Sequence, residues 1–184
     1  MDPNDRGTRE RTLLRAVLAG DEAAWELWYR ESFDRLYAYV SWRSGGLREL
    51  ADEIVQETWL TAVRRIRQFD PARGSFEGWL RGIAANVFRN QLRRKRRDDR
   101  VSEAAVAPDR KAEAPRRDQA ERVALALSEL PDHYETVLRA KYLEQQSVNQ
   151  IAATLGQTTK AVESLLTRAR DAFREAYLKE DRER

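Results

Sequence analysis

The chain has 184 residues, of which 35% are charged and 41% are hydrophobic, and its formal net charge is +3. This balance is too polar for one large core and too apolar for a disordered chain, and no apolar run approaches the roughly 18 residues of a membrane span. With no cysteine and a single histidine, His133, the sequence excludes disulfide frameworks, zinc fingers, thiol nucleophiles and His-rich metal sites, so we expect a cytoplasmic protein without a metal or another cofactor.

Helical periodicity without strand-like alternation predicts an all-α fold of two small helical domains joined by a flexible linker. In the first domain (1–97), Asp21 can cap one helix, and a second helix is expected from residue 47 to about residue 67. Residues 69–75 contain an Asp-Pro pair and a glycine and predict a loop. A third, long helix then begins at Phe76, and its predicted apolar face comprises Phe76, Trp79, Leu80, Ile83, Ala84 and Val87.

The composition changes between residues 98 and 118. This segment contains two prolines, many charged residues and no aromatic residue, so it has nothing with which to build an apolar face. We therefore expect it to be the flexible linker between the two domains.

The second domain (119–184) contains a predicted helix-turn-helix between about residues 148 and 167. Ser147 and Gln150 form a capping box, Gly156 makes the turn, and Thr158 can cap the last helix. The alternative is an ordinary helical hairpin with a glycine turn. In a helix-turn-helix the second helix enters the major groove of DNA, and its outward residues here are Thr159, Lys160, Glu163, Ser164, Thr167 and Arg168.

Amide and guanidinium side chains share one face of the third helix, at Asn86, Arg89, Asn90 and Arg93. Arginine suits phosphates, whereas asparagine amides can bond base edges. Between residues 89 and 100 there are seven basic and two acidic residues, an excess larger than the net charge of the whole chain. The adjoining loop is flanked by Phe69 and Phe76, whose rings can stack on an unpaired base. A solvated helix end is the alternative, but the shared face favours DNA contact.

The second helix of the first domain carries an acidic stripe. A solvated acidic surface is one interpretation of it, and a docking surface for a basic partner helix is the other. The stripe comprises Glu49, Asp52, Glu53, Gln56 and Glu57.

Two sets of motifs resemble a known family. Residues 51–60 (ADEIVQETWL) and 78–86 (GWLRGIAAN), with the arginine run that follows, resemble region two of the extracytoplasmic-function sigma factors. Residues 127–131 (LSELP) and 162–170 (VESLLTRAR) resemble region four of the same family. The resemblance spans roughly residues 13 to 177, with both regions in the family's order.

The resemblance implies a promoter-specificity subunit of bacterial RNA polymerase, which is not itself an enzyme. It implies that Glu53, Gln56 and Glu57 dock on the clamp helices of the polymerase β′ subunit, with Glu49 and Asp52 on the same surface. It also implies that region four reads the minus-thirty-five element and touches the β flap. An anti-sigma factor is a further partner suggested by the resemblance alone. The residues matched to minus-ten recognition are Phe69, Arg73, Ser75, Asn86, Arg89, Asn90 and Arg93.

Glu163 departs from the family's pattern, because many members carry Arg or Lys after the valine of the recognition helix. A carboxylate can accept a hydrogen bond from the amino group of cytosine. The alternative is a surface pair between Glu163 and Lys160, and the sequence leaves both open. For the whole chain, the alternative function is a helix-turn-helix transcriptional regulator that acts without binding core polymerase.

Overall fold

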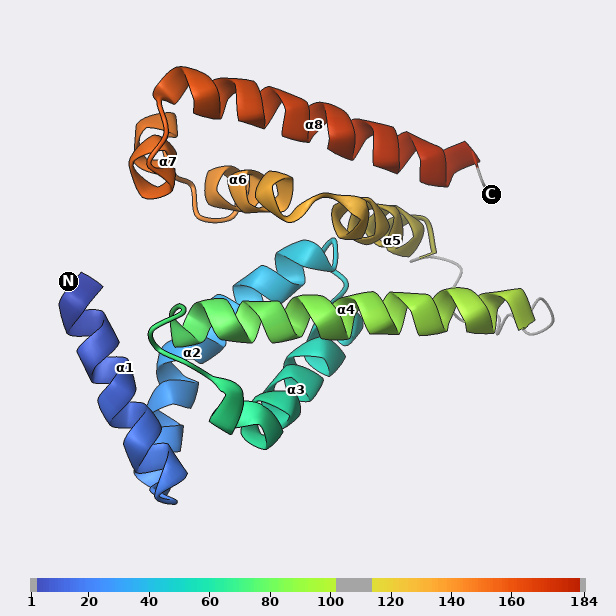
Figure 1. The fold of residues 1–184 in the computed structure, drawn as a ribbon. Helices are drawn as coiled ribbons and strands as arrows, with labels where there is room; N and C mark the ends of the chain where they lie inside the picture. The colour runs from blue at the N-terminus through green and yellow to red at the C-terminus, as the bar shows by residue number, and fades with distance from the viewer. Residues whose placement is uncertain (1–2, 102–113, 183–184) are drawn as a thin grey trace. The chain divides into compact units, whose positions relative to one another are not determined.

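The computed structural model describes residues 3–101 and 114–182, which fold into two units (Figure 1). Unit 1 comprises Met1–Val40 and Arg48–Glu103, and unit 2 comprises Ser41–Leu47 and Ala104–Arg184. Within the described residues every regular element is a helix, which confirms the all-α fold. In chain order these are α1 (Pro3–Leu18), α2 (Glu22–Arg43), α3 (Arg48–Arg65), the short 3₁₀ helix η1 (Ile66–Gln68), α4 (Phe76–Val101), α5 (Ala114–Glu129), α6 (Asp132–Tyr142), α7 (Val148–Leu155) and α8 (Thr159–Arg182).

The start of α2 follows a local signal in the sequence. The Asp21 carboxylate accepts hydrogen bonds from the backbone N–H groups of Ala23 and Ala24, at 2.9 and 3.3 Å, and so caps α2 as predicted. The sequence did not predict α1, whose residues include Gly7 and only a short apolar run.

Among residues 3–101 and 114–182, no helix combines the length and the apolar character that crossing a membrane requires.

An aromatic cluster forms the centre of unit 1. The ring of Phe76 stacks on that of Trp28, with ring centroids 4.1 Å apart and planes within 5° of parallel. Phe69 meets both rings edge-on, at 5.9 Å from Trp28 and 5.5 Å from Phe76, and Trp79 lies 5.5 Å from Phe69. The two ends of the loop 69–75 are therefore anchored in the core.

The start of α4 is held by two polar side chains. The Ser75 hydroxyl accepts a hydrogen bond from the N–H of Gly78 at 3.1 Å, as an N-cap does. The buried Glu10 carboxylate, from α1, accepts one from the N–H of Phe76 at 3.1 Å. Helix N-termini carry unpaired N–H groups and a partial positive charge, which a carboxylate stabilises.

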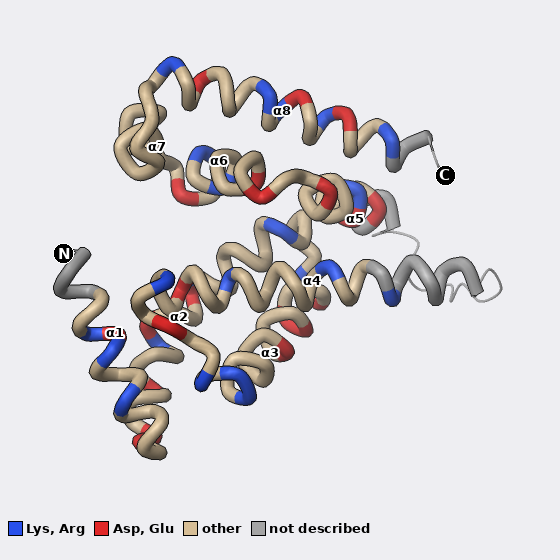
Figure 2. The backbone as a smooth tube through the Cα atoms, in the orientation of Figure 1, with Lys and Arg blue, Asp and Glu red and all other residues tan. Residues whose placement is uncertain are grey.

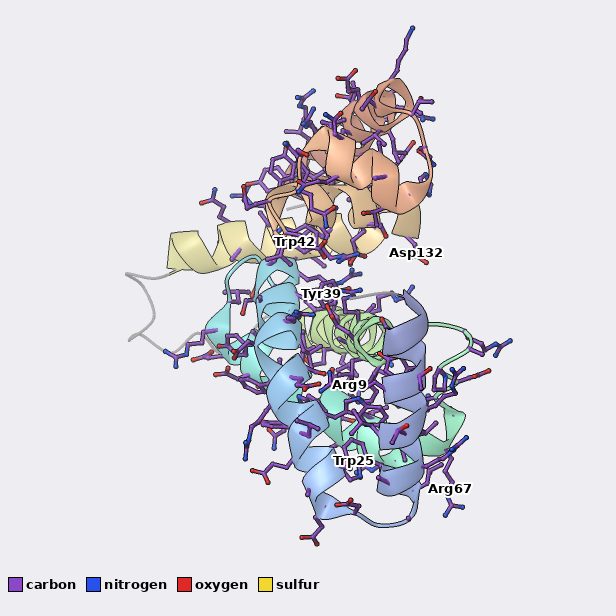
Figure 3. The ribbon with its side chains drawn as sticks, turned by 90° about the vertical axis from the view of Figure 1, so that its left-hand side faces the viewer. Arg9, Trp25, Tyr39, Trp42, Arg67 and Asp132 are labelled. Carbon is purple, nitrogen blue, oxygen red and sulfur yellow. The ribbon has the colours of Figure 1, made fainter. Side chains whose placement is uncertain are left out.

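A salt bridge between Arg9 and Glu31 joins α1 to α2, and Figure 3 shows Arg9 and Trp25 between these two helices.

The helices extend into both ends of the expected linker. Helix α4 continues to Val101 and α5 begins at Ala114, whereas the sequence predicted that the first domain ends at residue 97 and the second begins at residue 119. A long charged helix can continue beyond the core it packs on, because alanine and arginine favour helix without burial. The middle of the expected linker, residues 102–113, lies outside the described residues.

Unit 2 contains the predicted helix-turn-helix. The Ser147 hydroxyl accepts from the N–H of Gln150, and the Gln150 side chain accepts from the N–H of Ser147, which completes the capping box of α7. Gly156 ends α7 with φ at +62°, a left-handed conformation that favours glycine. Helix α8 packs along α5 and α6 (Figure 1), and the core of the unit includes Leu127, Val137, Leu138, Ile151, Val162, Leu166 and Ala169.

Ser41–Leu47 belongs to unit 2, although the sequence predicted that it is part of the first domain. Within this unit Trp42 packs against the hydrophobic core, and Arg43 forms a buried salt bridge with Glu135. Gly45 has φ at +62°, and a Cβ at this position would lie 2.3 Å from the backbone oxygen of Ala120. Only glycine allows this close approach.

We expect Glu10→Ala to destabilise unit 1 by about 1–3 kcal/mol, because it leaves the buried N–H of Phe76 without its acceptor. Glu10→Gln keeps an acceptor oxygen and should cost less. The measurement is urea unfolding followed by tryptophan fluorescence, since Trp25, Trp28, Trp59 and Trp79 all lie in unit 1. Equal midpoints for wild type and Glu10→Ala would contradict the capping role, and Arg15→Ala, an exposed position on α1, is the control.

Candidate functional site

The acidic stripe is exposed on α3. All five of its residues face solvent, opposite the buried residues Ala51, Ile54, Val55, Thr58 and Ala62. Figure 2 shows the acidic positions in the first part of α3 and basic positions at its end. The stripe residues are Glu49, Asp52, Glu53, Gln56 and Glu57.

Aromatic and aliphatic groups adjoin this stripe. The Tyr37 hydroxyl of α2 donates to the Asp52 carboxylate at 3.0 Å, which orients that carboxylate. Further along α3, the side chains of Leu60 and Val63 are 44% and 54% exposed. Carboxylates beside exposed aliphatic side chains suit a partner surface that is both basic and apolar.

The residues Asn86, Arg89 and Asn90 form a stripe on α4 that we call the asparagine stripe. All three are exposed, while Phe88 on the opposite face of the helix is buried. Arg89 donates to the amide oxygen of Asn86 at 2.7 Å, so the two side chains form one unit. The backbone of Arg93 continues the helix, but its side chain lies outside the described residues.

The two phenylalanines at the ends of the loop 69–75 do not have the role expected from the sequence. Phe69 is only 5% exposed and Phe76 only 2%, so the expectation that their rings can stack on an unpaired base is wrong. Both rings belong to the aromatic cluster, because the core gives each ring more apolar contact than the surface of the loop would. Ser75 caps α4, and Arg73 is exposed at the middle of the loop.

A groove between α3 and α4 brings together residues that the sequence assigned to separate surfaces. It has a volume of about 310 Å³ and adjoins the asparagine stripe. Glu57, assigned from the sequence to the docking surface, lines it, and so does Arg65, which was not among the predicted site residues. Arg64 and Arg65 are adjacent, and only the packing of α3 on α4 decides which of them lines the groove. The residues that line it include Glu57, Thr61, Arg65, Asn86, Asn90 and Gln91.

The second helix of the helix-turn-helix presents the predicted outward set. Val162, Leu165 and Leu166 are buried, which fixes the opposite face of α8. Within the described residues the Glu163 carboxylate forms no ion pair with Lys160, and neither side chain has another partner. The surface-pair interpretation of Glu163 therefore lacks support. The exposed residues are Thr159, Lys160, Glu163, Ser164, Thr167 and Arg168.

Two family models match the chain. Sigma-70 region 2 matches residues 28–98, which carry α3, the loop and most of α4. Sigma-70, region 4 matches residues 120–173, which carry the helix-turn-helix.

The chain is also similar to individual proteins. It is 31% identical to the ECF RNA polymerase sigma factor SigE of Mycolicibacterium smegmatis, over 89% of this chain and 66% of SigE, slightly under two thirds of that relative. It is 33% identical to the RNA polymerase sigma factor CarQ of Myxococcus xanthus, over 68% of this chain and 74% of CarQ. A solved structure of CnrH in complex with the cytosolic domain of CnrY is 26% identical, covers 94% of this chain and 98% of CnrH, and has a TM-score of 0.49.

Proposed function

Because the chain belongs to the extracytoplasmic-function (ECF) sigma factors of the sigma-70 family, we propose that it binds core RNA polymerase and directs it to specific promoters. The observation that carries this proposal is the separation of the two matched regions: region 2 falls mainly on unit 1 and region 4 on unit 2. Each unit also exposes side chains suited to nucleic acid. In this role the protein itself makes and breaks no covalent bond.

Core polymerase is the proposed partner of the acidic stripe on α3. Glu53 and Gln56 lie one turn apart and are exposed, and the aliphatic side chain of Leu60 follows one turn later. We propose that this surface receives the clamp helices of the β′ subunit. Carboxylates facing a basic helix would steer the encounter and set its orientation.

The minus-ten element is the proposed ligand of the exposed face of α4 and the adjoining loop. Asn86 is held by Arg89, so its amide N–H groups are presented in a fixed direction. Asn90 lies one turn further and has no side-chain partner within the described residues. The amides would contact bases, and Arg73, Arg89 and Arg93 would contact phosphates. Phe69 is excluded from this set by its burial, and Ser75 acts as the cap that positions α4.

The minus-thirty-five element is the proposed ligand of α8. The first turns of α8 carry the exposed polar set, and a recognition helix contacts base edges with its N-terminal residues. Lys160 and Arg168 would approach phosphates, whereas the unpaired Glu163 carboxylate can accept from cytosine. We also propose contact between region 4 and the β flap, action in the cytoplasm, and regulation by an anti-sigma factor.

Run-off transcription with purified core polymerase tests the proposed function. Core with the chain should initiate at specific start sites in a promoter library, whereas core alone should not. A chain that binds promoter DNA but neither binds core nor alters its start sites would favour the alternative, a regulator independent of core.

We expect the double change Glu53→Lys, Gln56→Ala to weaken core binding about tenfold or more, roughly 1.4 kcal/mol, because it reverses a charge in the proposed interface. Affinity for core is measured alongside helical circular dichroism. Asp34→Lys, an equal charge reversal at an exposed position of α2, is the matched control. Unchanged affinity in the folded double mutant would remove the docking assignment.

Replacing Asn86 and Asn90 by alanine should impair promoter opening and abolish the base preference within the minus-ten element. Permanganate footprinting of thymines on promoters with varied minus-ten sequences measures both effects. Asn149→Ala, an exposed asparagine of unit 2, should leave the preference unchanged. A double mutant that opens every sequence as wild type does would exclude base contact by these two amides.

We expect Arg73→Ala to lower the log-log salt slope of single-strand binding by about 0.7, the value for one phosphate contact.

We expect Glu163→Arg to change the preferred base at one position of the minus-thirty-five element, with about 1–3 kcal/mol of discrimination involved. Selection from a randomised minus-thirty-five library gives the consensus for each protein. Glu175→Arg makes the same charge change further along α8, at an exposed position, and should tighten binding without altering the consensus. An identical consensus for wild type and Glu163→Arg would show that Glu163 reads no base.

A further inference from the structure

Unit 1 contains a cavity that is separate from the groove between α3 and α4. It lies between α1, α2 and the start of α4, and its volume of about 460 Å³ is within the range for small-ligand sites, roughly 300–1,000 Å³. Leu13 and the buried rings of Trp28 and Phe76 give it an apolar wall. The match to Sigma-70 region 2 begins at residue 28, so α1 lies outside it. The surfaces proposed for polymerase and promoter DNA do not use this cavity.

The hydroxyl of Ser32 lines the cavity without a hydrogen-bond partner. Ser32 is only 6% exposed, and within the described residues its side chain takes part in no hydrogen bond. A hydroxyl inside a helix commonly donates to a carbonyl one turn back, as the buried Thr58 does to Ile54 at 2.6 Å, but Ser32 does not. A buried hydroxyl without a partner costs free energy, so a ligand that pairs with it would gain affinity.

Opposite charges of α2 border the cavity, and each is held by a different helix. Glu31 and Arg35 are four residues apart, a spacing that allows a direct ion pair. Glu31 instead pairs with Arg9 of α1, which Figure 3 shows between α1 and α2. Arg35 pairs with Glu77 of α4 at 3.0 Å. The cavity therefore presents carboxylate and guanidinium groups from three helices.

Arg35 can turn toward a ligand at little cost. Its side chain is 67% exposed, and Glu77 has a second ion pair, with Arg81, at 2.8 Å. If Arg35 moves to a ligand carboxylate, Glu77 keeps its pair with Arg81 and is not left as an uncompensated charge. A guanidinium group binds a carboxylate through two parallel hydrogen bonds, which fixes the orientation of the ligand.

The charges of the cavity select the class of ligand. Among the described residues, three carboxylates and two guanidinium groups line it. A ligand that is only an anion would face the carboxylates, and one that is only a cation would face the guanidinium groups. A zwitterion can pair its carboxylate with Arg35 and its ammonium group with Glu31, and the ammonium group can also donate to Ser32. An apolar side chain on the same ligand would pack against Trp28 and Phe76.

We infer that this cavity binds a free α-amino acid with an apolar side chain. Arg35 holds its carboxylate, while Glu31 and Ser32 hold its ammonium group. The inference is independent of the proposed function, because these three residues lie outside the surfaces proposed for polymerase and DNA. A ligand bound here contacts α1, α2 and α4 together and so stabilises the folded unit 1.

The test is an NMR titration of the full chain, labelled with ¹⁵N-phenylalanine, with unlabelled L-phenylalanine. The chain has five phenylalanines, of which Phe76 lines the cavity and Phe173 belongs to unit 2. We expect the backbone resonance of Phe76 to shift and that of Phe173 to stay. No shift of Phe76 at millimolar ligand, or a shift of Phe173 alone, would overturn the inference.

Three analogues each remove one feature of the ligand. N-acetyl-L-phenylalanine lacks the ammonium group, L-phenylalaninamide lacks the carboxylate, and glycine lacks the apolar side chain. We expect each to bind about tenfold more weakly than L-phenylalanine, or worse. Equal affinity for the amide would assign the cavity to the first residue of a peptide, and equal affinity for the acetylated form would assign it to the last. Either result would overturn binding of the free amino acid.

The variant Ser32→Ala tests the hydroxyl. It should weaken L-phenylalanine about fivefold, and alanine favours the helix, so the fold is retained. The matched control is Thr12→Ala, which removes an exposed hydroxyl of α1 outside the cavity and should leave the affinity unchanged.

The variant Arg35→Gln tests the carboxylate contact. It should weaken L-phenylalanine about tenfold but leave the affinity for L-phenylalaninamide unchanged, because the amide has no carboxylate to lose. Arg30→Gln, at an exposed position of α2 that does not line the cavity, should alter neither affinity. Wild-type affinity for L-phenylalanine in folded Ser32→Ala and Arg35→Gln chains would show that the ligand does not bind through these residues and would contradict the assignment.

Discussion

The stacking of Phe76 on Trp28, with Phe69 against the edges of both rings, is the constraint on which unit 1 depends. Phe76 is the first residue of α4 and Phe69 is the first residue of the loop, so burying both fixes where the loop starts and where the helix begins. From Phe76 onward, the helical period alone sets the direction of each α4 side chain. Burial of Leu80 and Phe88 then turns the asparagine stripe outward.

Helix α3 links the two activities proposed for unit 1. Glu53 and Gln56 lie on the exposed stripe proposed for polymerase, while Glu57 and Arg65 line the groove against α4. Since α3 also packs against α4, DNA bound at the asparagine stripe would take a fixed position relative to the docked polymerase. The charges are separated along the same helix, with acidic residues near its start and basic residues in its last turn.

The proposed nucleic-acid surfaces do not need a high net charge on the whole chain, because its net charge of +3 is unevenly distributed. Phosphate binding needs local positive potential rather than a basic chain as a whole. In unit 2 the exposed start of α8 mixes Lys160 and Arg168 with Glu163, which weakens general affinity for phosphates. Such a mixture suits a helix whose contacts select among sequences, because a carboxylate disfavours every approach except one that offers it a donor.

The sequence by itself determined the features that depend on neighbours along the chain. The Asp21 cap, the Ser147 and Gln150 capping box and the turn at Gly156 were predicted correctly, because each is formed by residues within a few positions of one another. The exposed sets on α3, α4 and α8 were also predicted, since helical spacing separates the buried side from the exposed side.

Only the tertiary structure decided which residues from different helices meet. Three features join residues distant in sequence: the burial of Phe69, the capping of α4 by Glu10, and the groove that Arg65 lines together with Asn86 and Asn90. Spacing gives each side chain a direction about its own helix axis, but not the neighbouring helix that it faces. An aromatic residue beside a loop has the same local pattern whether it contacts a ligand or the core, and the packing of Trp28 against it settled that choice.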